Sequence, residues 1–378
     1  MLLTIDIGTS KFKTALWDYE GNRHFYSAVV LGDSLNDGEK NEVDCNEWLK
    51  ALKTCLRELK DLKKVKAIVI CGNGPSLVPV LGSPFASADG IFVPAEKCRL
   101  WLDRRAVKYT AEVSALMGGF VDSGFFLPKI LGIKNDENEL YSKVKYFLGC
   151  PEYLAYALTG EGRTVFPSEG FDRWFWNDSV LEKLELDKEK FPPFIRPGDL
   201  FGFVSGQAAS CFGFAEKTPV VSGGPDFFAA ILGAGVTEPF YACDRTGSSE
   251  GINLCTQEQV FDKRLMSYRH PVKPYWNLSG IINTTGRAIQ WGSNILGLSD
   301  LNDFFTLAKE SKKGSGGLVF VPYLAGERSP LWDPSVRGLW KGLSLSQGRS
   351  EIANSVLEGI GFAIRDVLGA MKETGEKV

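Results

Sequence analysis

Histidine is scarce in this sequence, and its scarcity argues against one class of chemistry. Only His24 and His270 occur among 378 residues. His24 lies in a polar segment and His270 directly precedes Pro271, and neither has a serine or cysteine partner within a motif. Histidine is the usual general base of nucleophilic triads. We therefore expect any general base in this protein to be a carboxylate.

Other common features are also missing. The eight cysteines include no Cys-x-x-Cys pair, which argues for reduced thiols and against a disulfide frame or a zinc site. No apolar run reaches membrane-spanning length, and Asp6 places a charge too early for a signal peptide. The net charge of −3 shows no basic excess for binding a nucleic acid. We expect a cytoplasmic protein with no nucleic-acid or membrane partner.

The composition is that of a globular protein with a sizeable core. Hydrophobic residues make up 44% of the chain and charged residues 24%. A length of 378 residues predicts two domains or three. The segment Val236-Thr-Glu-Pro239 interrupts the pattern of strands and helices. We place the domain boundary there, with domains at 1–236 and 237–378.

A single carboxylate stands out between a predicted strand and a predicted helix. Residues 218–222 are apolar and β-branched, Gly223 and Gly224 allow a sharp turn, and an apolar segment follows Asp226. Asp226 is thus expected at a helix N-terminus, where exposed N–H groups favour a carboxylate. It is either a proton acceptor for a substrate hydroxyl or only a helix cap.

Two predicted hairpins carry hydroxyl-rich turns, one in each half of the chain. The first joins strands at 2–7 and 12–17 through Gly8-Thr9-Ser10, and the second joins 240–243 to 252–255 through Thr246-Gly247-Ser248-Ser249. Such turns can present N–H and O–H groups to a phosphate. Asp6, at the end of the first strand, could hold Mg²⁺ through water. The alternatives are an ordinary turn near Asp6 and a flexible turn at 246–249.

Two further segments carry polar and aromatic groups suited to a sugar. Gly72-Asn73-Gly74-Pro75 forms a loop after a buried strand, and Trp101, Asp103 and Arg105 precede a helix. An aromatic ring with nearby polar groups can grip a polyol. The alternative for 101–105 is a surface helix start with an ion pair. Periodic apolar residues predict further helices at 141–148, 151–159, 287–295 and 350–371.

These motifs together resemble those of the FGGY carbohydrate kinases, over the whole chain. The resemblance implies an α/β fold of two actin-like ATPase (ribonuclease H-like) domains around a cleft. The motifs that carry it are Asp6-x-Gly-Thr-Ser10, the 72–76 loop, Trp101-x-Asp103-x-Arg105, Tyr153-Leu-Ala-Tyr-x-Leu-Thr-Gly160, Gly223-Gly-x-Asp226, Thr246-Gly-Ser-Ser249, Pro322-Tyr-Leu-x-Gly-Glu-Arg-Ser-Pro330, Arg337-Gly338 and Leu357-Glu-Gly-Ile-Gly-Phe362.

The resemblance also implies roles for individual residues. Asp226 matches the catalytic base that takes the proton from the sugar hydroxyl, and Asp6 matches the acid near Mg²⁺. ATP is the implied phosphoryl donor, and a sugar or polyol, with a ketopentose such as xylulose favoured, is the acceptor. The implied ATP-binding residues are Gly8, Thr9, Ser10, Lys13, Thr246, Gly247, Ser248 and Ser249. The implied sugar-binding residues are Asn73, Gly74, Pro75, Trp101, Asp103, Arg105 and Asp226.

Three features depart from the family pattern. Phe227 stands where a polar residue often follows the base, and Glu250 adds a negative charge beside the second turn. The sequence ends at Val378, where the family continues into a glycine-rich adenosine-binding strand, so we expect an incomplete second domain. A truncated sequence, a split gene with a separate C-terminal fragment, or a decayed paralogue would each account for this.

The resemblance leaves alternatives for function and assembly. One is a sugar-binding paralogue without kinase activity, and another is a different actin-like ATPase, against which Trp101-x-Asp103-x-Arg105 argues. The sequence does not show the oligomeric state, although dimers are common among similar proteins, so the alternatives for assembly are a homodimer and a separate C-terminal kinase fragment.

Overall fold

The computed structural model describes residues 1–32, 35–37, 39–87, 90–333 and 335–377. The chain separates into two compact units, Met1–Ala229 and Ala230–Val378. The division falls inside helix α8 (Asp226–Gly233), a few residues before the boundary that we propose at residue 236. Each unit is described by itself. Among the described residues, no helix combines the length and the apolar character required to cross a membrane.

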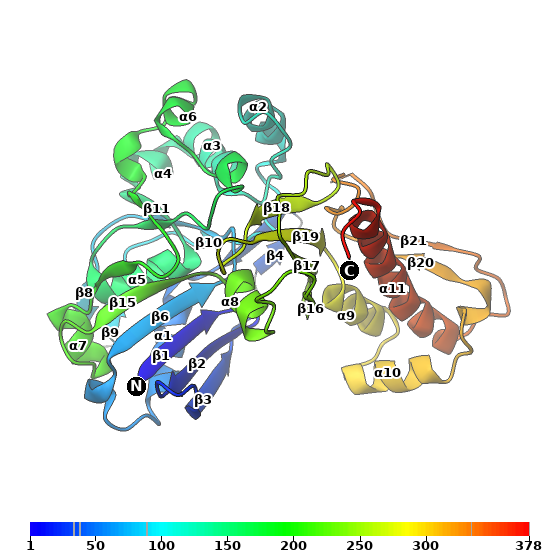
Figure 1. The fold of residues 1–378 in the computed structure, drawn as a ribbon, viewed down its shortest axis with the longest axis horizontal. Coiled ribbons are helices and arrows are strands. Elements are labelled where there is room, and N and C mark those ends of the chain that lie inside the picture. The colour runs from blue at the N-terminus through cyan, green and yellow to red at the C-terminus, as the bar shows by residue number, and fades with distance from the viewer. Residues whose placement is uncertain (33–34, 38, 88–89, 334, 378) are drawn as a thin grey trace. The chain divides into compact units, whose positions relative to one another are not determined.

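A six-stranded mixed sheet forms the centre of unit 1 (Figure 1), in the order β14-β15-β6-β1-β2-β3. Its strands are β1 (Leu2–Ile7), β2 (Lys11–Trp17), β3 (Arg23–Val30), β6 (Ala67–Gly72), β14 (Leu200–Phe203) and β15 (Pro219–Pro225). β1, β6 and β15 are parallel neighbours, whereas β2 is antiparallel to β1 and to β3. The predicted first hairpin is therefore confirmed as β1 and β2.

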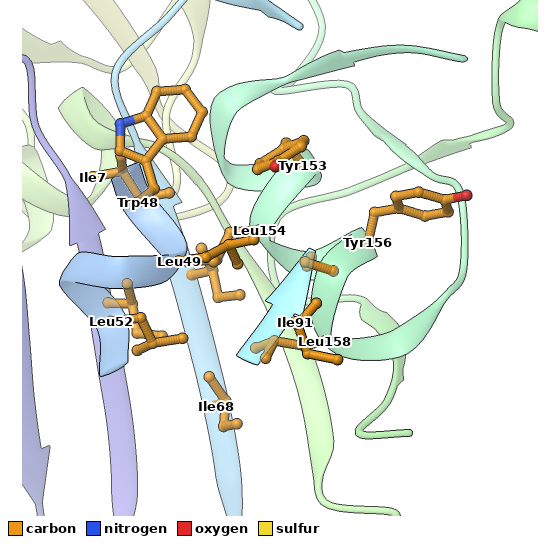
Figure 2. Packing of buried hydrophobic residues seen from close by; sticks show 14 of the residues in the cluster. Ile7, Trp48, Leu49, Leu52, Ile68, Ile91, Tyr153, Leu154, Tyr156 and Leu158 are labelled. Atoms are coloured by element: carbon orange, nitrogen blue, oxygen red, sulfur yellow. The ribbon is translucent and has the colours of Figure 1, made fainter. Parts of the chain in front are cut away.

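The core of unit 1 forms where two helices pack over this sheet. Alternation along β1 buries Leu3, Ile5 and Ile7. Helix α1 (Asn46–Leu56) contributes Trp48, and α5 (Cys150–Thr159) contributes Tyr153, whose ring meets that of Trp48 edge-on with the centroids 5.8 Å apart. Figure 2 shows Ile7, Trp48 and Tyr153 within one apolar cluster, to which Leu3 and Ile5 also belong.

A second sheet corrects one predicted helix. We expected a helix over 141–148, but α4 (Asn138–Lys143) ends early and β11 (Tyr146–Gly149) follows. β11 pairs antiparallel with β7 (Leu77–Val80) and buries Phe147 and Leu148. Tertiary pairing thus overrides the local helical pattern, because it satisfies backbone groups and buries apolar side chains at once.

The remaining elements of unit 1 are short. The second sheet has the order β11-β7-β10-β5-β4. Its other strands are β4 (Leu35–Asp37), β5 (Lys40–Val43) and β10 (Cys98–Arg99). The paired strands β8 (Phe85–Ser87) with β9 (Gly90–Phe92), and β12 (Thr164–Val165) with β13 (Phe194–Ile195), lie outside both sheets. The other helices are α2 (Thr110–Leu116), α3 (Phe126–Asp136), α6 (Asp178–Lys183) and α7 (Gly206–Phe212).

Unit 2 is built on a four-stranded antiparallel sheet in the order β16-β17-β19-β18. Its elements are β16 (Ala242–Thr246), β17 (Glu250–Thr256), β18 (Met266–Arg269), β19 (Trp276–Ile282), α9 (Gly286–Ile295), α10 (Leu301–Lys309), β20 (Val319–Val321), β21 (Leu339–Lys341) and α11 (Arg349–Glu373). The predicted hairpin at 240–255 and the helices at 287–295 and 350–371 are confirmed. α11 buries Val367 against the sheet and Val356 in the cluster it forms with α9 and α10.

Candidate active site

Three neighbouring parallel strands of unit 1, β1, β6 and β15, end at the same edge of the sheet, and the candidate acids lie at or just after these ends. Asp6 of β1 is the register partner of Cys71 of β6, and Cys71 is the partner of Gly224 of β15. β15 ends at Pro225, and Asp226 then begins α8. Open α/β sheets bind ligands outside the carboxyl ends of their parallel strands. The candidate acids Asp6 and Asp226 therefore lie at the edge where a ligand site is expected.

Lys13 is paired with one of these acids and feels the charge of both. Its ammonium lies 2.7 Å from Oδ2 of Asp6, across the β1–β2 register. Burial lowers the pKa of Lys13, but the hydrogen bond and the charge of Asp6, helped by the charge of Asp226, leave it raised. Lys13 was predicted as an ATP-binding residue, and the structure places it on Asp6.

The thiol of Cys71 lies in the same electrostatic field. Burial, followed by the negative charges of Asp6 and Asp226, raises the pKa of Cys71 to about 12, while Lys13 opposes the shift. Since a nearby like charge disfavours ionisation, the thiol is protonated at neutral pH. Cys71 is therefore not a nucleophile in this site, but it reports on both carboxylates.

The first hydroxyl turn closes tightly between β1 and β2. The N–H of Gly8 donates to the carbonyl of Lys11 at 3.0 Å, and a Cβ on Gly8 would stand only 2.9 Å from that oxygen. Ser10 is exposed and Thr9 is partly exposed. The indole N–H of Trp101 donates to Oγ1 of Thr9 at 3.4 Å. The structure thus connects the predicted phosphate turn to one predicted sugar residue.

The 72–76 loop is tied to β1 through Asn73. Its main-chain N–H and its side-chain amide both donate to the carbonyl of Ile7, at 2.8 and 3.0 Å. The side-chain oxygen Oδ1 of Asn73 accepts a hydrogen bond from the hydroxyl of Ser76, and Asn73 is only 4% exposed. Asn73 therefore shapes the loop, and Gly74 and Pro75 follow it on the chain.

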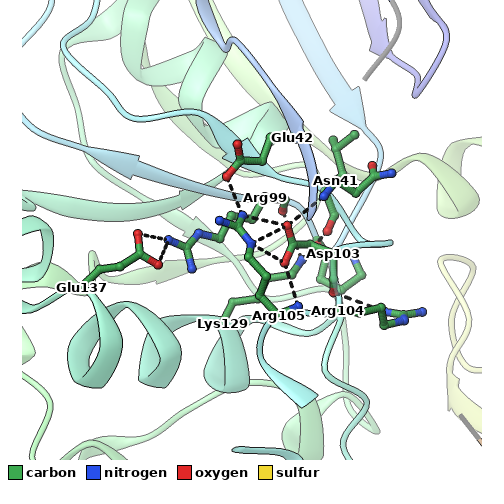
Figure 3. A network of polar contacts seen from close by, with 10 residues as sticks. Asn41, Glu42, Arg99, Asp103, Arg104, Arg105, Lys129 and Glu137 are labelled. Carbon is green, nitrogen blue, oxygen red and sulfur yellow. Dashed lines mark hydrogen bonds and ion pairs between the residues drawn. The ribbon is translucent and has the colours of Figure 1, made fainter. Parts of the chain in front are cut away.

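Asp103 is the centre of a buried polar network (Figure 3). It is 1% exposed, pairs with Arg105 at 2.8 Å, and accepts the main-chain N–H of Asn41 at 3.0 Å. Arg105 also pairs with Glu42 at 2.5 Å. Burial raises the pKa of Asp103, but the hydrogen bonds from Arg105 and Asn41 outweigh it and leave the pKa lowered. Asp103 and Arg105 thus form hydrogen bonds and ion pairs with other protein groups. Because Asp103 is buried, the pair is not the surface ion pair that was the alternative for this segment.

Phe227, directly after Asp226, belongs to an aromatic cluster within unit 1. Its ring stacks on Phe171 with the centroids 5.9 Å apart and meets Phe228 edge-on at 4.8 Å. Phe171 in turn contacts Trp174. The residue that follows Asp226 in the chain therefore packs among aromatic rings.

The second hydroxyl turn, in unit 2, rests on the start of α9. The N–H of Gly286 donates to the carbonyl of Gly247 at 3.1 Å, and the N–H of Arg287 donates to that of Ser248 at 3.3 Å. A Cβ on Gly286 would lie 2.3 Å from the Gly247 oxygen, so the close approach requires glycine. Thr246 and Gly247 are exposed, while Ser248 and Ser249 are half-exposed.

Glu250 is buried beside this turn, and its charge acts on a second acid, Asp244. It is 2% exposed and accepts the hydroxyl of Thr246 at 2.9 Å. Desolvation, followed by a hydrogen bond and repulsion from Glu250, raises the pKa of Asp244 to about 7. Asp244 is therefore partly protonated near neutral pH, which reduces the negative charge expected beside the turn.

The Pro322–Pro330 motif has a structural basis in unit 2. Glu327 is 2% exposed, and its Oε1 accepts the main-chain N–H groups of Asn283 and Arg328 at 2.8 and 2.7 Å. Arg328 donates to Oδ1 of Asn283 at 2.6 Å. Burial raises the pKa of Glu327 to about 7, although these N–H bonds oppose the shift. The motif therefore joins the 326–330 loop to the end of β19.

Sequence reasoning missed Lys129, which lies on α3 and is fully buried. Its ammonium donates to the main-chain carbonyls of Pro75, Arg99 and Leu100. The only signal in the sequence is a lysine within the apolar run Phe125–Ile133, which by itself does not reveal a partner.

Comparison with known proteins agrees with this architecture. Xylulose kinase from Escherichia coli (strain K12) is 26% identical over 398 residues, covering 100% of this chain and 80% of that protein. Gluconokinase from Bacillus subtilis (strain 168) is 23% identical, covering 98% of this chain and 77% of its own length. The structure of ligand-bound xylulose kinase from Lactobacillus acidophilus has a TM-score of 0.78 at 22% identity, covering 98% of this chain and 78% of that one, and so shares the fold.

This architecture is that of sugar kinases with two actin-like ATPase domains, so the predicted fold class is confirmed. Residues 1–233 match the N-terminal domain of the FGGY family of carbohydrate kinases, and residues 245–378 match its C-terminal domain. The chain belongs to this family. It is a carbohydrate kinase, which uses ATP to phosphorylate a sugar.

Proposed function

We propose that this kinase transfers the γ-phosphoryl group of ATP to a hydroxyl of a ketopentose, with xylulose as the first candidate. The similarity to a protein named xylulose kinase, which covers 100% of this chain and 80% of that protein, supports this choice. The similar coverage of a gluconokinase makes gluconate the competing acceptor.

We assign the general base to Asp226. The observation that carries the assignment is the register of β1, β6 and β15, which aligns Asp6, Cys71 and Gly224 and leaves Asp226 at the start of α8. In phosphoryl transfer the protein mainly positions groups and stabilises charge, while one carboxylate accepts the proton of the attacking hydroxyl.

The residues at this edge of the sheet fit Mg²⁺. Among the described residues, no group of three or more His, Cys, Asp or Glu side chains could hold a metal ion. Mg²⁺ does not require one, because it keeps several waters and binds one or two carboxylates together with substrate phosphates. Asp6 would hold the ion through water, and its ion pair with Lys13 would then weaken. The bound ion would neutralise phosphate charge.

The remaining predicted residues form two groups: those that we propose contact ATP or the sugar, and those that hold these contacting segments in place. We propose that phosphates bind at the two hydroxyl turns, Thr9 and Ser10 in unit 1 and Thr246 to Ser249 in unit 2, because all of these residues are exposed or partly exposed. Trp101 supplies a ring for a sugar face. The other predicted sugar-binding side chains, Asn73, Asp103 and Arg105, form hydrogen bonds or ion pairs with protein groups. We propose that they hold the sugar-binding segments in place and do not contact the sugar.

Steady-state kinetics with a panel of acceptors tests the proposal. ADP release from ATP is measured with xylulose, ribulose, gluconate and glycerol, and we expect the highest kcat/KM for a ketopentose. Asp226→Asn should lower kcat by at least about 10²-fold, because a general base contributes about 10²–10⁴-fold, while calorimetry still detects sugar binding. Asp178→Asn, an exposed carboxylate on α6, is the matched control and should keep full activity.

Two outcomes would overturn the proposal. An unchanged kcat for Asp226→Asn would remove Asp226 from the role of base. Sugar binding without turnover of any acceptor by the wild-type protein would instead indicate a non-catalytic sugar-binding protein.

A further inference from the structure

Lys129 is a fully buried cation whose partners all belong to the main chain. The residue is 0% exposed, and its ammonium donates to the carbonyls of Pro75 at 2.9 Å, Arg99 at 3.1 Å and Leu100 at 2.7 Å. Lysine is almost never fully buried, because removing its charge from water costs several kcal/mol unless the charge is well satisfied. A buried lysine of this kind therefore needs an explanation.

The number of bonds matches the chemistry of the group. An ammonium has three N–H donors and no acceptor, and here three carbonyl oxygens receive them. A neutral amine would have only two donors, and its lone pair would face one of the carbonyls. Burial lowers the pKa of Lys129 to about 7, while the charge of Asp103 opposes the shift.

The three carbonyls come from two segments that are distant in sequence. Pro75 belongs to the 72–76 loop after β6, and Arg99 and Leu100 directly precede Trp101. These are the two segments that the proposed function places on the sugar side. Lys129 lies on α3, and its ammonium donates hydrogen bonds to both segments.

We propose that Lys129 is a positioning residue for the sugar, which holds the 72–76 loop and the 99–105 segment in a fixed relation through its three carbonyl bonds. It does not contact the sugar, because it is sealed from solvent. A shift of about 1 Å in a binding group can cost about 10²-fold in rate. The role of the two segments rests on the proposed function, whereas the cross-link itself does not.

The first test compares two lysine-to-methionine substitutions in unit 1. Lys129→Met removes the three donors and keeps an unbranched side chain. Lys190→Met is the matched control, since Lys190 is 9% exposed and donates at 2.7 Å to the carbonyl of Val144, outside both segments. We expect Lys129→Met to raise the KM for sugar at least about tenfold, with the KM for ATP unchanged, and Lys190→Met to change neither constant.

The second test does not depend on activity. Hydrogen exchange of the 72–76 and 99–105 amides is followed in the wild type and in both variants, and Lys129→Met should accelerate it in both segments together. Lys129→Arg is the second variant should Lys129→Met not fold. It keeps the charge, but its planar fork does not match three carbonyls around a point, so we expect a smaller change in the same direction.

Each outcome decides between the possibilities. Unchanged exchange in both segments, or an equal change in Lys190→Met, would overturn the proposal. Accelerated exchange with an unchanged KM for sugar would keep the cross-link but remove its role in sugar binding. A wild-type protein that turns over no sugar would contradict the proposed function, and the exchange result would still decide whether Lys129 joins the segments.

Discussion

The thiol sulfur of Cys71 lies 4.0 Å from Oδ1 of Asp6, because the two residues are register partners on β6 and β1. This contact places an ionisable reporter beside a candidate magnesium ligand. It also links the predictions about the site to a quantity that can be measured without turnover.

Asp6→Asn should make Cys71 more reactive. Burial and the charges of Asp6 and Asp226 raise the pKa of Cys71 to about 12, so the loss of one carboxylate lowers this pKa and increases the thiolate fraction. We expect alkylation of the Cys71 peptide at pH 8 to accelerate a few-fold, measured by mass spectrometry. Cys211 on α7 serves as the internal control, and its alkylation should not change. An unchanged rate at Cys71 would mean that Asp6 does not act on it.

Glu327→Gln should change the pH dependence of stability. The pKa of Glu327 is raised in the folded state from 4.5 to about 7 by burial, so its contribution is fully present below pH 4.5 and is lost as the pH rises through 7. The amide keeps an acceptor for the N–H groups of Asn283 and Arg328 without this loss. The difference in free energy of unfolding, variant minus wild type, should therefore grow between pH 4.5 and 8 by up to about 3 kcal/mol.

Urea unfolding at several pH values checks this prediction. A difference that stays constant with pH would mean that Glu327 titrates normally in the folded protein. A difference that shrinks as the pH rises would contradict the direction of the pKa shift.

Two glycines on α11 should respond in opposite directions to alanine. A Cβ on Gly359 would lie 2.3 Å from the carbonyl oxygen of Phe320, whereas nothing lies within 4 Å of a Cβ on Gly361. Gly359→Ala should destabilise by about 1–3 kcal/mol through overpacking. Gly361→Ala should stabilise by up to about 1 kcal/mol, because alanine is the better helix former. Denaturant midpoints measure both, and equal effects would refute the packing of α11 against Phe320.

Thr246→Val should affect nucleotide use more than sugar use. It removes the hydroxyl that donates to Glu250 at 2.9 Å, and a buried polar group that loses a partner costs about 1–3 kcal/mol. The second hydroxyl turn should loosen, and the KM for ATP should rise about tenfold while the KM for sugar stays unchanged. Thr246→Ser retains the hydroxyl and should restore ATP binding. Equal kinetics for the valine and serine variants would exclude this role.

Several elements of the fold could be predicted because their signals are local. The hairpin of β1 and β2 follows from apolar strands around a Gly-Thr-Ser turn, and α11 follows from a long 3.6-residue period. β11 could not be predicted, because its stability depends on pairing with β7, which lies far away in the sequence. The short 141–148 stretch has a pattern compatible with either structure until that partner is known.

The site divides in the same way. Asp226 could be recognised as a residue at the start of a helix after a buried strand, and the two hydroxyl turns could be found from their composition. The burial of Asp103 and the carbonyl partners of Lys129 could not be, because a charged residue in a sequence window carries no information about main-chain oxygens elsewhere in the fold.

By itself, the sequence determined several strands and helices, such as the first hairpin and the long helix at 350–371, together with the resemblance to the FGGY kinases and the candidate acids, since turn chemistry and apolar periodicity act over a few residues. Only the tertiary structure decided that Asp6, Cys71 and Gly224 are neighbours and that Lys129 joins two distant segments. Register and burial depend on close packing between parts of the chain far apart in sequence, and this packing is a property of the whole unit.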